Sequence, residues 1–174
     1  MGMVDAFVQE IEQEAKTTRR MLERVPADKF SWKPHTKSMS LGQLALHVAE
    51  SPGFVCGWAI DDTTDFSGSF EQVLPKSTED LLTAHDASLD RTKEILRNLG
   101  DAGLQKMWSA KANGATLMTM PKAALVRVIV MNHLVHHRGQ LSVYLRLLDV
   151  PVPSIYGPSA DENPFATTAA AATV

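Results

Sequence analysis

Apolar residues recur at helical spacing in four separate stretches of the chain. Because residues three and four apart share one face of a helix, each stretch predicts an amphipathic helix that turns this face to a core. The first stretch runs from Met3 to about Glu23, and Pro26 follows it, where the proline ring ends the hydrogen-bond ladder. Its apolar positions are Val4, Phe7, Val8, Ile11, Ala15 and Leu22.

The second helix is predicted to begin at Ser40. Gln43 stands three residues later, which is the spacing of a capping box. The apolar face of this helix includes His47, so this histidine is expected to point inward. Pro52 and Gly53 are expected to break or kink the helix, because proline removes a backbone donor. The shared face consists of Leu41, Leu44, His47, Val48 and Ser51.

A third helix is predicted from about Ser77 or Thr78 to Leu99, with Gly100 as its C-terminal stop. His85 lies at the edge of its apolar stripe and is a reserve candidate for a metal ligand. Its apolar face consists of Leu81, Leu82, His85, Leu89, Thr92, Ile95, Leu96 and Leu99.

The fourth and longest helix is predicted from about Pro121 to Leu148, because no other proline falls in this range and its residues favour a helix. Two histidines, His133 and His137, fall on its apolar stripe, and the stripe should turn them toward the core. The stripe consists of Val126, Ile129, Val130, His133, His137, Leu141, Tyr144 and Leu148.

The remaining segments are predicted to connect these helices. Residues 61–70 are polar and rich in turn-forming residues, which predicts a long loop. Residues 101–119 contain two glycines and short apolar pieces, which predicts a loop or a small hairpin. The prolines of 150–158 predict an extended segment. The pattern as a whole favours an all-α fold, a four-helix bundle formed by one domain over 1–165, with a poorly ordered tail at 166–174.

Composition narrows the class of protein. The 174 residues can form one sizeable core, and the net charge of −3 shows no basic excess, so nucleic acid is not an expected partner. No stretch is long and apolar enough to span a membrane. Cys56 is the single cysteine, which excludes an internal disulfide, favours a cytoplasmic protein and fits a small buried side chain.

The histidines are unevenly distributed, with three of the six inside five residues. His133 and His137 stand one helical turn apart, so both imidazoles can reach one ion, whereas His136 points elsewhere. Hydrogen-bonded core histidines are the alternative interpretation, but two imidazoles at ligand spacing on an apolar face favour a metal. Placing His47 against this pair predicts a site with three nitrogen ligands.

Three protein nitrogens with an open position are typical of catalytic rather than structural zinc sites. Nickel, iron(II) or manganese would also suit imidazole ligands. Such an ion polarises an oxygen or lowers the pKa of a bound water or thiol. The chain has no His-Glu-x-x-His, Gly-x-Ser-x-Gly or Gly-rich phosphate motif that would indicate another chemistry.

These residues resemble the DinB/YfiT-like superfamily, and the resemblance covers most of the chain in the order of its elements. The specific motifs are those of the second and fourth helices. The runs that carry it are Leu44-Ala45-Leu46-His47-Val48-Ala49-Glu50, His133-x-x-x-His137-Arg138-Gly139-Gln140-Leu141 and Val152-Pro153-x-x-Tyr156-Gly157.

The resemblance implies an up-down-down-up bundle, commonly a homodimer, in which three histidines hold nickel or zinc. Carried over to this chain, the implied ligands are His47, His133 and His137. Some members of the superfamily are transferases that use a low-molecular-weight thiol such as mycothiol, bacillithiol or glutathione. The implied partners are therefore a small-molecule substrate, for which such a thiol is one candidate, and a second copy of the chain.

Five further residues have two interpretations each. Arg138 can bind an anionic substrate group or a neighbouring subunit, or it can be a solvated arginine. Gln140 can support a metal ligand or lie on the surface, and Glu50 can orient a ligand, act as a base or be exposed. Tyr144 and Trp58 can line a pocket or belong to the core.

Three functions from different classes follow from these observations. The first is a metal-dependent enzyme, a thiol S-transferase or a hydrolase. The second is a non-catalytic bundle that binds a metal or a small molecule, in which the ion joins two helices. The third is a dimeric interaction protein whose histidines hold no metal.

Overall fold

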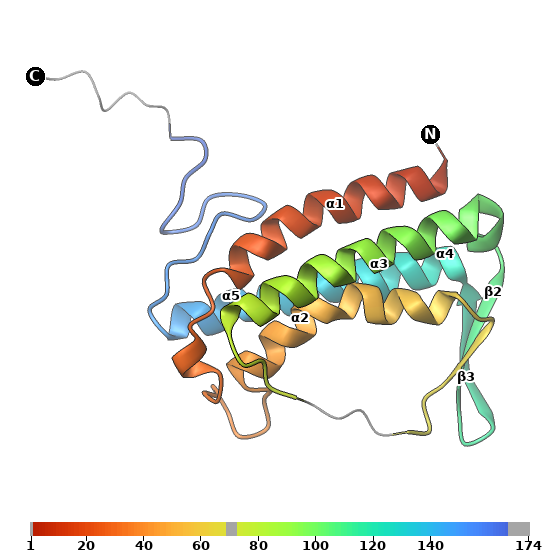
Figure 1. The fold of residues 1–174 in the computed structure, drawn as a ribbon, viewed down its shortest axis with the longest axis horizontal. Coiled ribbons are helices and arrows are strands. Elements are labelled where there is room, and N and C mark those ends of the chain that lie inside the picture. The colour runs from red at the N-terminus through yellow and green to blue at the C-terminus, as the bar shows by residue number, and fades with distance from the viewer. Residues whose placement is uncertain (1, 69–72, 167–174) are drawn as a thin grey trace, which may run out of the picture.

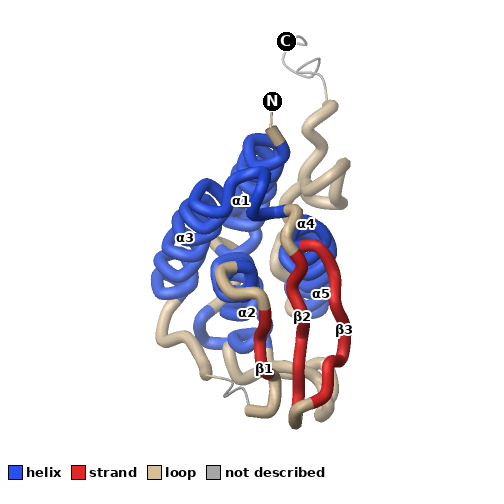
Figure 2. Tube along the Cα trace, turned by 90° about the vertical axis from the view of Figure 1, so that its right-hand side faces the viewer, coloured by secondary structure: helices blue, strands red, loops and turns tan. Residues whose placement is uncertain are grey.

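The structure is a computed structural model that describes residues 2–68 and 73–166, and within them four long helices lie side by side (Figure 1). A three-stranded sheet closes one end of the bundle, where α3 ends and the fourth helix begins (Figure 2). The long helices are α1 (Met3–Leu22), α2 (Leu41–Cys56), α3 (Thr78–Leu104) and α5 (Asn132–Leu147).

The helices α2 and α3 run in the same direction, and α1 and α5 run in the opposite one (Figure 1). This is the up-down-down-up order that the resemblance implies. Because two consecutive helices are parallel, a long crossover over residues 57–77 must return the chain from one end of the bundle to the other. Of the described residues in that crossover, Thr63–Asp65 form β1, and Val73 lines a pocket together with His47.

The first helix forms as its apolar spacing predicts, with Phe7, Ile11 and Ala15 buried. Its N-terminus is capped from another helix, because the Asp101 carboxylate accepts the backbone N–H groups of Met3 and Val4 at 3.0 and 2.8 Å. These hydrogen bonds hold the pKa of Asp101 below its ordinary value. At this end of the bundle, α1 and α3 are therefore joined by a helix cap as well as by core packing.

The second helix begins with the predicted capping box, in which Ser40 and Gln43 bond each other's backbone N–H groups. It does not break at Pro52 and stays helical to Cys56. The Ser88 hydroxyl from α3 explains this continuity, because it accepts the Gly53 N–H at 2.8 Å and donates to the Glu50 carbonyl at 3.1 Å. Backbone groups on both sides of the proline are thus bonded to a side chain of the neighbouring helix.

Replacing Gly53 by Val is expected to destabilise the protein by about 1–3 kcal/mol, because a Cβ at this position would lie 2.8 Å from the Ser88 carbonyl oxygen. The neighbour is backbone, so it cannot rotate away. Urea denaturation followed by circular dichroism measures the change. Gly139→Ala is the control, because no heavy atom lies within 4 Å of its added Cβ and alanine favours a helix. Equal stability of the two variants would contradict the close packing of α2 on α3.

The third helix continues past its predicted end. Gly100 has a left-handed φ of 62° and kinks the helix, which then resumes as far as Leu104. The predicted stop is therefore only a kink, because Leu104 is fully buried and Asp101 caps α1, so the residues after Gly100 are held by tertiary contacts. His85 is buried on this helix.

The sheet corrects the prediction of an all-α fold. Strands β2 (Met107–Ala112) and β3 (Ala115–Pro121) form the hairpin that was one interpretation of 101–119, and β1 (Thr63–Asp65) lies parallel to β2 inside the predicted loop. The turn of the hairpin is Asn113-Gly114, with φ values of 50° and 78°, as two-residue turns require.

The sheet has its own small core against the bundle. Trp108 is buried with Ala59 and Leu125, and its indole N–H donates to the Thr64 hydroxyl at 2.9 Å. The sequence pattern does not reveal β1, because this strand has three residues and the whole of α3 separates it from β2 along the chain. A strand this short has no hydrophobic period of its own.

The fourth predicted helix is continuous but consists of three segments, two α-helical and one π-helical. It begins as α4 (Lys122–Ala124), passes through the π-helical segment η3 (Leu125–Met131) and continues as α5. A π turn takes more residues than an α turn, so it rotates everything after it relative to a regular helix. The predicted inward stripe is consequently wrong by one position at His133, His137 and Tyr144, whereas Leu141 is buried as predicted. The buried residues of α5 are Leu134, Arg138, Leu141 and Leu145.

The chain after α5 runs without regular structure, as the prolines predict, and ion pairs attach it to the bundle. Glu162 pairs with Arg20 at 2.5 Å, and Asp161 pairs with Arg146. Of the predicted tail, residues 167–174 lie outside the described part. The single domain over 1–165 stays a prediction.

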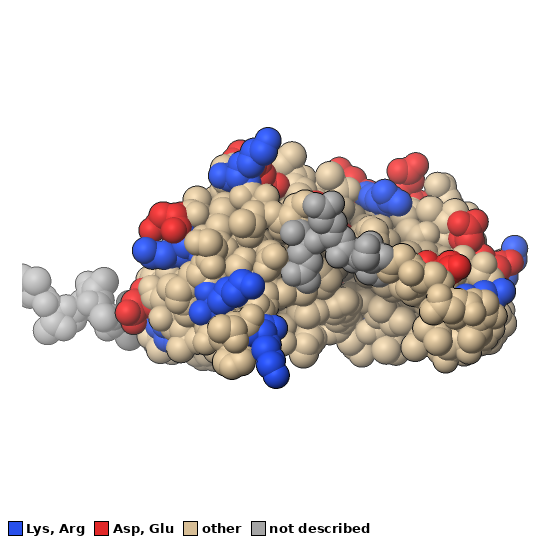
Figure 3. All heavy atoms as spheres, turned by 90° about the horizontal axis from the view of Figure 1, so that it is seen from below, with Lys and Arg blue, Asp and Glu red and all other residues tan. Residues whose placement is uncertain are grey.

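The helices of the described residues include none that is both long and apolar enough to cross a membrane. On the face shown in Figure 3, acidic and basic side chains lie scattered among each other and form no patch of a single sign. This distribution agrees with the weak net charge of the chain.

Candidate metal centre

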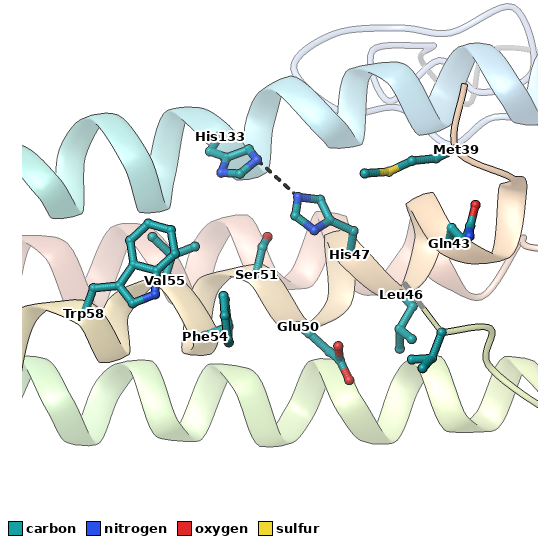
Figure 4. Close-up of a pocket in the computed structure, with 11 residues that line it drawn as sticks. Met39, Gln43, Leu46, His47, Glu50, Ser51, Phe54, Val55, Trp58 and His133 are labelled. Carbon is teal, nitrogen blue, oxygen red and sulfur yellow. Dashed lines mark hydrogen bonds between the residues drawn. The ribbon is translucent and has the colours of Figure 1, made fainter. Parts of the chain in front are cut away.

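Three imidazoles from two helices meet beside the core. His47 comes from α2, and His133 and His137 come from α5, and one ligand atom of each lies within 4.8 Å of the others. The Nε2 atoms of His47 and His133 are 3.1 Å apart and face each other (Figure 4). The ring of His137 stands edge-on to that of His47, with centroids 4.5 Å apart. The structure thus brings together all three predicted ligands.

The distance between the Nε2 atoms of His47 and His133 fits a shared metal ion. Zinc–nitrogen bonds of 2.0–2.1 Å place two ligand nitrogens about 2.9 Å apart at a right angle and about 3.3 Å apart at a tetrahedral angle. The Nε2 atoms of His47 and His133 are 3.1 Å apart, which lies between these values. The donor set, three half-buried imidazoles without a thiolate, suits a divalent transition-metal ion.

The two imidazoles of α5 are held by hydrogen bonds from its own residues. The Nδ1 of His137 lies 2.8 Å from the Gln140 side-chain oxygen, so the proton sits on Nδ1 and the lone pair on Nε2. The His133 ring makes a hydrogen bond with the Ile129 backbone, one turn earlier. Partners of this kind orient metal-binding histidines. Of the two interpretations of Gln140, the structure supports a role next to a ligand, although its side chain is exposed.

The environment keeps the three rings neutral. Burial and, to a smaller extent, the neighbouring rings of His137 and His133 together lower the pKa of His47 to about 4. Burial also lowers the pKa values of His133 and His137. A metal binds only the unprotonated imidazole, so three neutral rings at ordinary pH are ready to act as ligands.

The other histidines considered from sequence lie apart from this group. His85 is buried on α3 and interacts with Asp86 at 3.3 Å, and burial lowers its pKa. It is not part of the three-histidine group among the described residues. His136 is exposed, as its position on the helix predicts, although its ring lies 4.8 Å from that of His137.

Arg138 is buried in the core, so the interpretation of a solvated arginine is wrong. Only 1% of its surface is exposed, and its guanidinium bonds the Glu14 carboxylate at 2.6 Å, the Tyr156 hydroxyl at 2.6 Å and the Thr18 hydroxyl at 3.1 Å. The shift of register in η3 is the reason, because it turns Arg138 inward and leaves His137 at the edge of the core. The arginine therefore joins α1, α5 and the C-terminal segment.

Glu50 is exposed, and its carboxylate points away from His47 and His133 (Figure 4). Partial burial nonetheless raises its pKa. Tyr144 is half-buried and donates to the Met39 carbonyl at 3.3 Å, and Trp58 lines a pocket. Cys56 is buried as predicted, and burial raises the pKa of its thiol to about 12, so it is no candidate nucleophile.

A pocket of about 380 Å³ opens beside His47 and His133, a size typical of small-molecule sites. Of the two aromatic residues that the sequence offered as lining residues, Trp58 lines this pocket and Tyr144 is not among its described lining residues. Ser51 was assigned to the inward face of α2 without a role, although it stands one turn after His47. The other lining residues are Met39, Gln43, Leu46, Phe54, Val55 and Val73.

The fold and the site define a class, a helical bundle with a small terminal sheet and a group of three histidines beside a pocket. The chain belongs to the DinB family, whose family model matches residues 1–166. The resemblance read from the sequence motifs is thereby confirmed.

Among curated proteins, the uncharacterized protein YrdA of Bacillus subtilis is 25% identical over 160 residues, which cover 91% of each chain. A DinB-like protein from Bacillus cereus has a similar structure, with a TM-score of 0.69 and 21% identity, covering 87% of this chain and 97% of that one. For the DinB-like protein YjoA of Bacillus subtilis, the TM-score is 0.67 at 22% identity, with 87% and 96% coverage. At these identities the structural likeness shows the fold.

Proposed function

We propose that His47, His133 and His137 bind one divalent metal ion and that this DinB-family chain is a metal-dependent enzyme. The observation that carries the proposal is the convergence of three neutral imidazoles, with ligand atoms within 4.8 Å of one another, at the wall of a pocket. Three protein ligands leave a coordination position for a small molecule, which a purely structural ion does not need.

When bound, the ion supplies a Lewis acid that lowers the pKa of a water or thiol. The chain positions this chemistry. Gln140 and the Ile129 backbone fix the two rings of α5, and α2 presents His47 from the opposite side. The apolar side chains of the pocket exclude bulk water from the substrate, which strengthens every electrostatic interaction there.

Nickel and zinc are the preferred metals for three imidazoles, and iron(II) and manganese are the alternatives. The reaction class is a thiol-dependent S-transfer or a hydrolysis, with a small molecule as substrate. The second candidate function is a non-catalytic ion that joins α2 to α5. The interaction protein without a metal is the third, and the homodimer stays a prediction in all three cases.

Metal analysis of the protein purified without a histidine tag tests the proposal. We expect about one equivalent of nickel or zinc per chain, and chelation should lower Tm because the ion binds only the folded site. An unchanged Tm and less than a tenth of an equivalent, even after loading with either metal and dialysis, would contradict a metal centre.

Cobalt(II) substitution then separates an enzyme from a structural ion. The visible spectrum of cobalt reports its coordination, so a small thiol that reaches the open position should add a near-ultraviolet thiolate band. A spectrum that does not respond to thiol, azide or cyanide would contradict an open position and favour the ion that only joins two helices.

A further inference from the structure

We propose that the pocket beside the three histidines binds a mainly apolar molecule without negative charge, whose acceptor oxygen receives a hydrogen bond from Ser51. The inference rests on the proposed function, since it names the substrate class of the same site. It is argued from three features of the pocket: one hydroxyl, the charge of the lining and the character of the walls.

The Ser51 hydroxyl is the first feature. Ser51 is only 4% exposed, and its oxygen has no hydrogen-bond partner among the described residues. It lines the pocket one helical turn after His47, and Figure 4 shows the hydroxyl pointing toward the space below His133. A buried hydroxyl without a partner costs about 1–3 kcal/mol, so such groups in folded proteins call for a partner.

The alternative partner for Ser51 would lie in its own helix, where a serine commonly bonds the carbonyl four residues earlier. Thr92 and Thr18 do this at 2.8 and 2.9 Å on α3 and α1. The Ser51 hydroxyl does not bond a carbonyl of its own helix, because it points into the pocket instead. The hydroxyl is therefore positioned to donate to a molecule in the pocket.

Charge is the second feature. Among the described lining residues Glu50 is the only charged side chain, and no lysine or arginine is present. A carboxylate or phosphate bound here would lose its water without gaining a cation from the lining, and Glu50 would repel it. The metal would offset one such charge at its own position and leave a second one unpaired.

The walls are the third feature. Leu46, Val55 and Trp58 present apolar surface, and the rings of Phe54 and Trp58 stand edge to face with centroids 5.8 Å apart. Walls of this kind favour an aromatic or aliphatic body. A neutral or cationic apolar molecule fits this lining, whereas a thiol with carboxylates, such as glutathione, does not.

The test uses two fluorescent probes that share one ring system, with the protein freed of metal by chelation. The ketone 6-propionyl-2-dimethylaminonaphthalene is neutral and has an acceptor oxygen, and 6-dimethylamino-2-naphthoate carries a carboxylate in its place. Quenching of tryptophan fluorescence reports binding near Trp58. We expect the ketone to bind at least about tenfold more tightly than the naphthoate.

Variants assign the binding to the pocket. Ser51→Ala should weaken the ketone by about two- to tenfold without lowering Tm, because it removes one hydrogen bond and an unsatisfied group. Ser142→Ala is the matched control, since this helical serine bonds the Gly139 carbonyl and lies outside the pocket lining. Glu50→Gln should improve naphthoate binding several-fold.

The outcomes separate this inference from the metal centre. Equal or tighter binding of the naphthoate, or an unaltered ketone affinity in Ser51→Ala, would overturn the substrate class even if the protein holds its metal. Conversely, selective and Ser51-dependent ketone binding by a protein that never takes up metal would support the pocket and reject the metal-dependent enzyme.

Discussion

Replacing Arg138 by Ala is expected to lower the free energy of unfolding by about 3–5 kcal/mol, the largest loss of stability from a single substitution considered for this chain. The guanidinium is 1% exposed, and Glu14, its ion-pair partner, has a side chain that is 13% exposed. Truncating the arginine leaves that carboxylate without its cation and the Tyr156 hydroxyl without one of its partners. Urea denaturation followed by circular dichroism measures the loss.

Arg146→Ala is the matched control for this experiment. Arg146 also pairs with a carboxylate, that of Asp161, but 48% of its side chain is exposed. Exposed ion pairs contribute about 0–1 kcal/mol, so the control should change stability little. Similar losses in the two variants would contradict the assignment of Arg138 to the core. If Arg138 instead bound substrate, the variant would lose ligand affinity and keep its stability.

Replacing His137 by Ala is expected to abolish stoichiometric metal binding while leaving the helical content intact. Two imidazoles from different helices remain, and two ligands hold a divalent ion far less tightly than three. The fold should survive because the histidine is half-buried, and α5 is anchored by Leu134, Leu141 and Leu145. Metal analysis and far-ultraviolet circular dichroism measure the two outcomes.

His136→Ala is the control for metal binding, because this neighbouring histidine is exposed and stands outside the three-residue group. It should retain the full metal content of the unaltered chain. Loss of metal in His136→Ala together with retention in His137→Ala would show that the ligands are misassigned. Loss of helical content in His137→Ala would mean that the ion is needed for folding, which favours the structural role.

The buried arginine also explains how the C-terminal segment stays in place. Arg138 reaches the Tyr156 hydroxyl, and Tyr156 in turn donates to Glu14 at 2.7 Å. Because consecutive residues of a helix lie about 100° apart, this contact holds α5 at a second face beside that of the imidazoles. We infer that the network sets the rotation of α5 and, with it, the direction in which His133 and His137 point.

Local patterns in the sequence determined much of the fold. The apolar spacing placed four long helices, and the Ser40–Gln43 capping box gave the start of α2. The pairing of His133 with His137 also follows from sequence, because residues one helical turn apart share a face in an α-helix. The hydrogen bond between His137 and Gln140 is also local, because both residues belong to α5.

The tertiary structure decided the rest. The π-helical segment η3 carries no sequence signal that sets it apart from an α-helix, yet it shifts the buried face by one residue and exchanges the environments of His137 and Arg138. Strand β1 has three residues and exists only because β2 lies beside it. The continuity of α2 at Pro52 also depends on a tertiary contact, because Ser88 of α3 accepts the Gly53 N–H.

The candidate site shows this division most clearly. Sequence determined which histidines share a helical face, since that depends on neighbours along the chain. The 3.1 Å approach of His47 to His133, the pocket and the unpartnered hydroxyl of Ser51 depend on how α2 packs against α5. Packing between helices is fixed by the sum of many weak contacts over the whole core, and a one-dimensional pattern does not contain that sum.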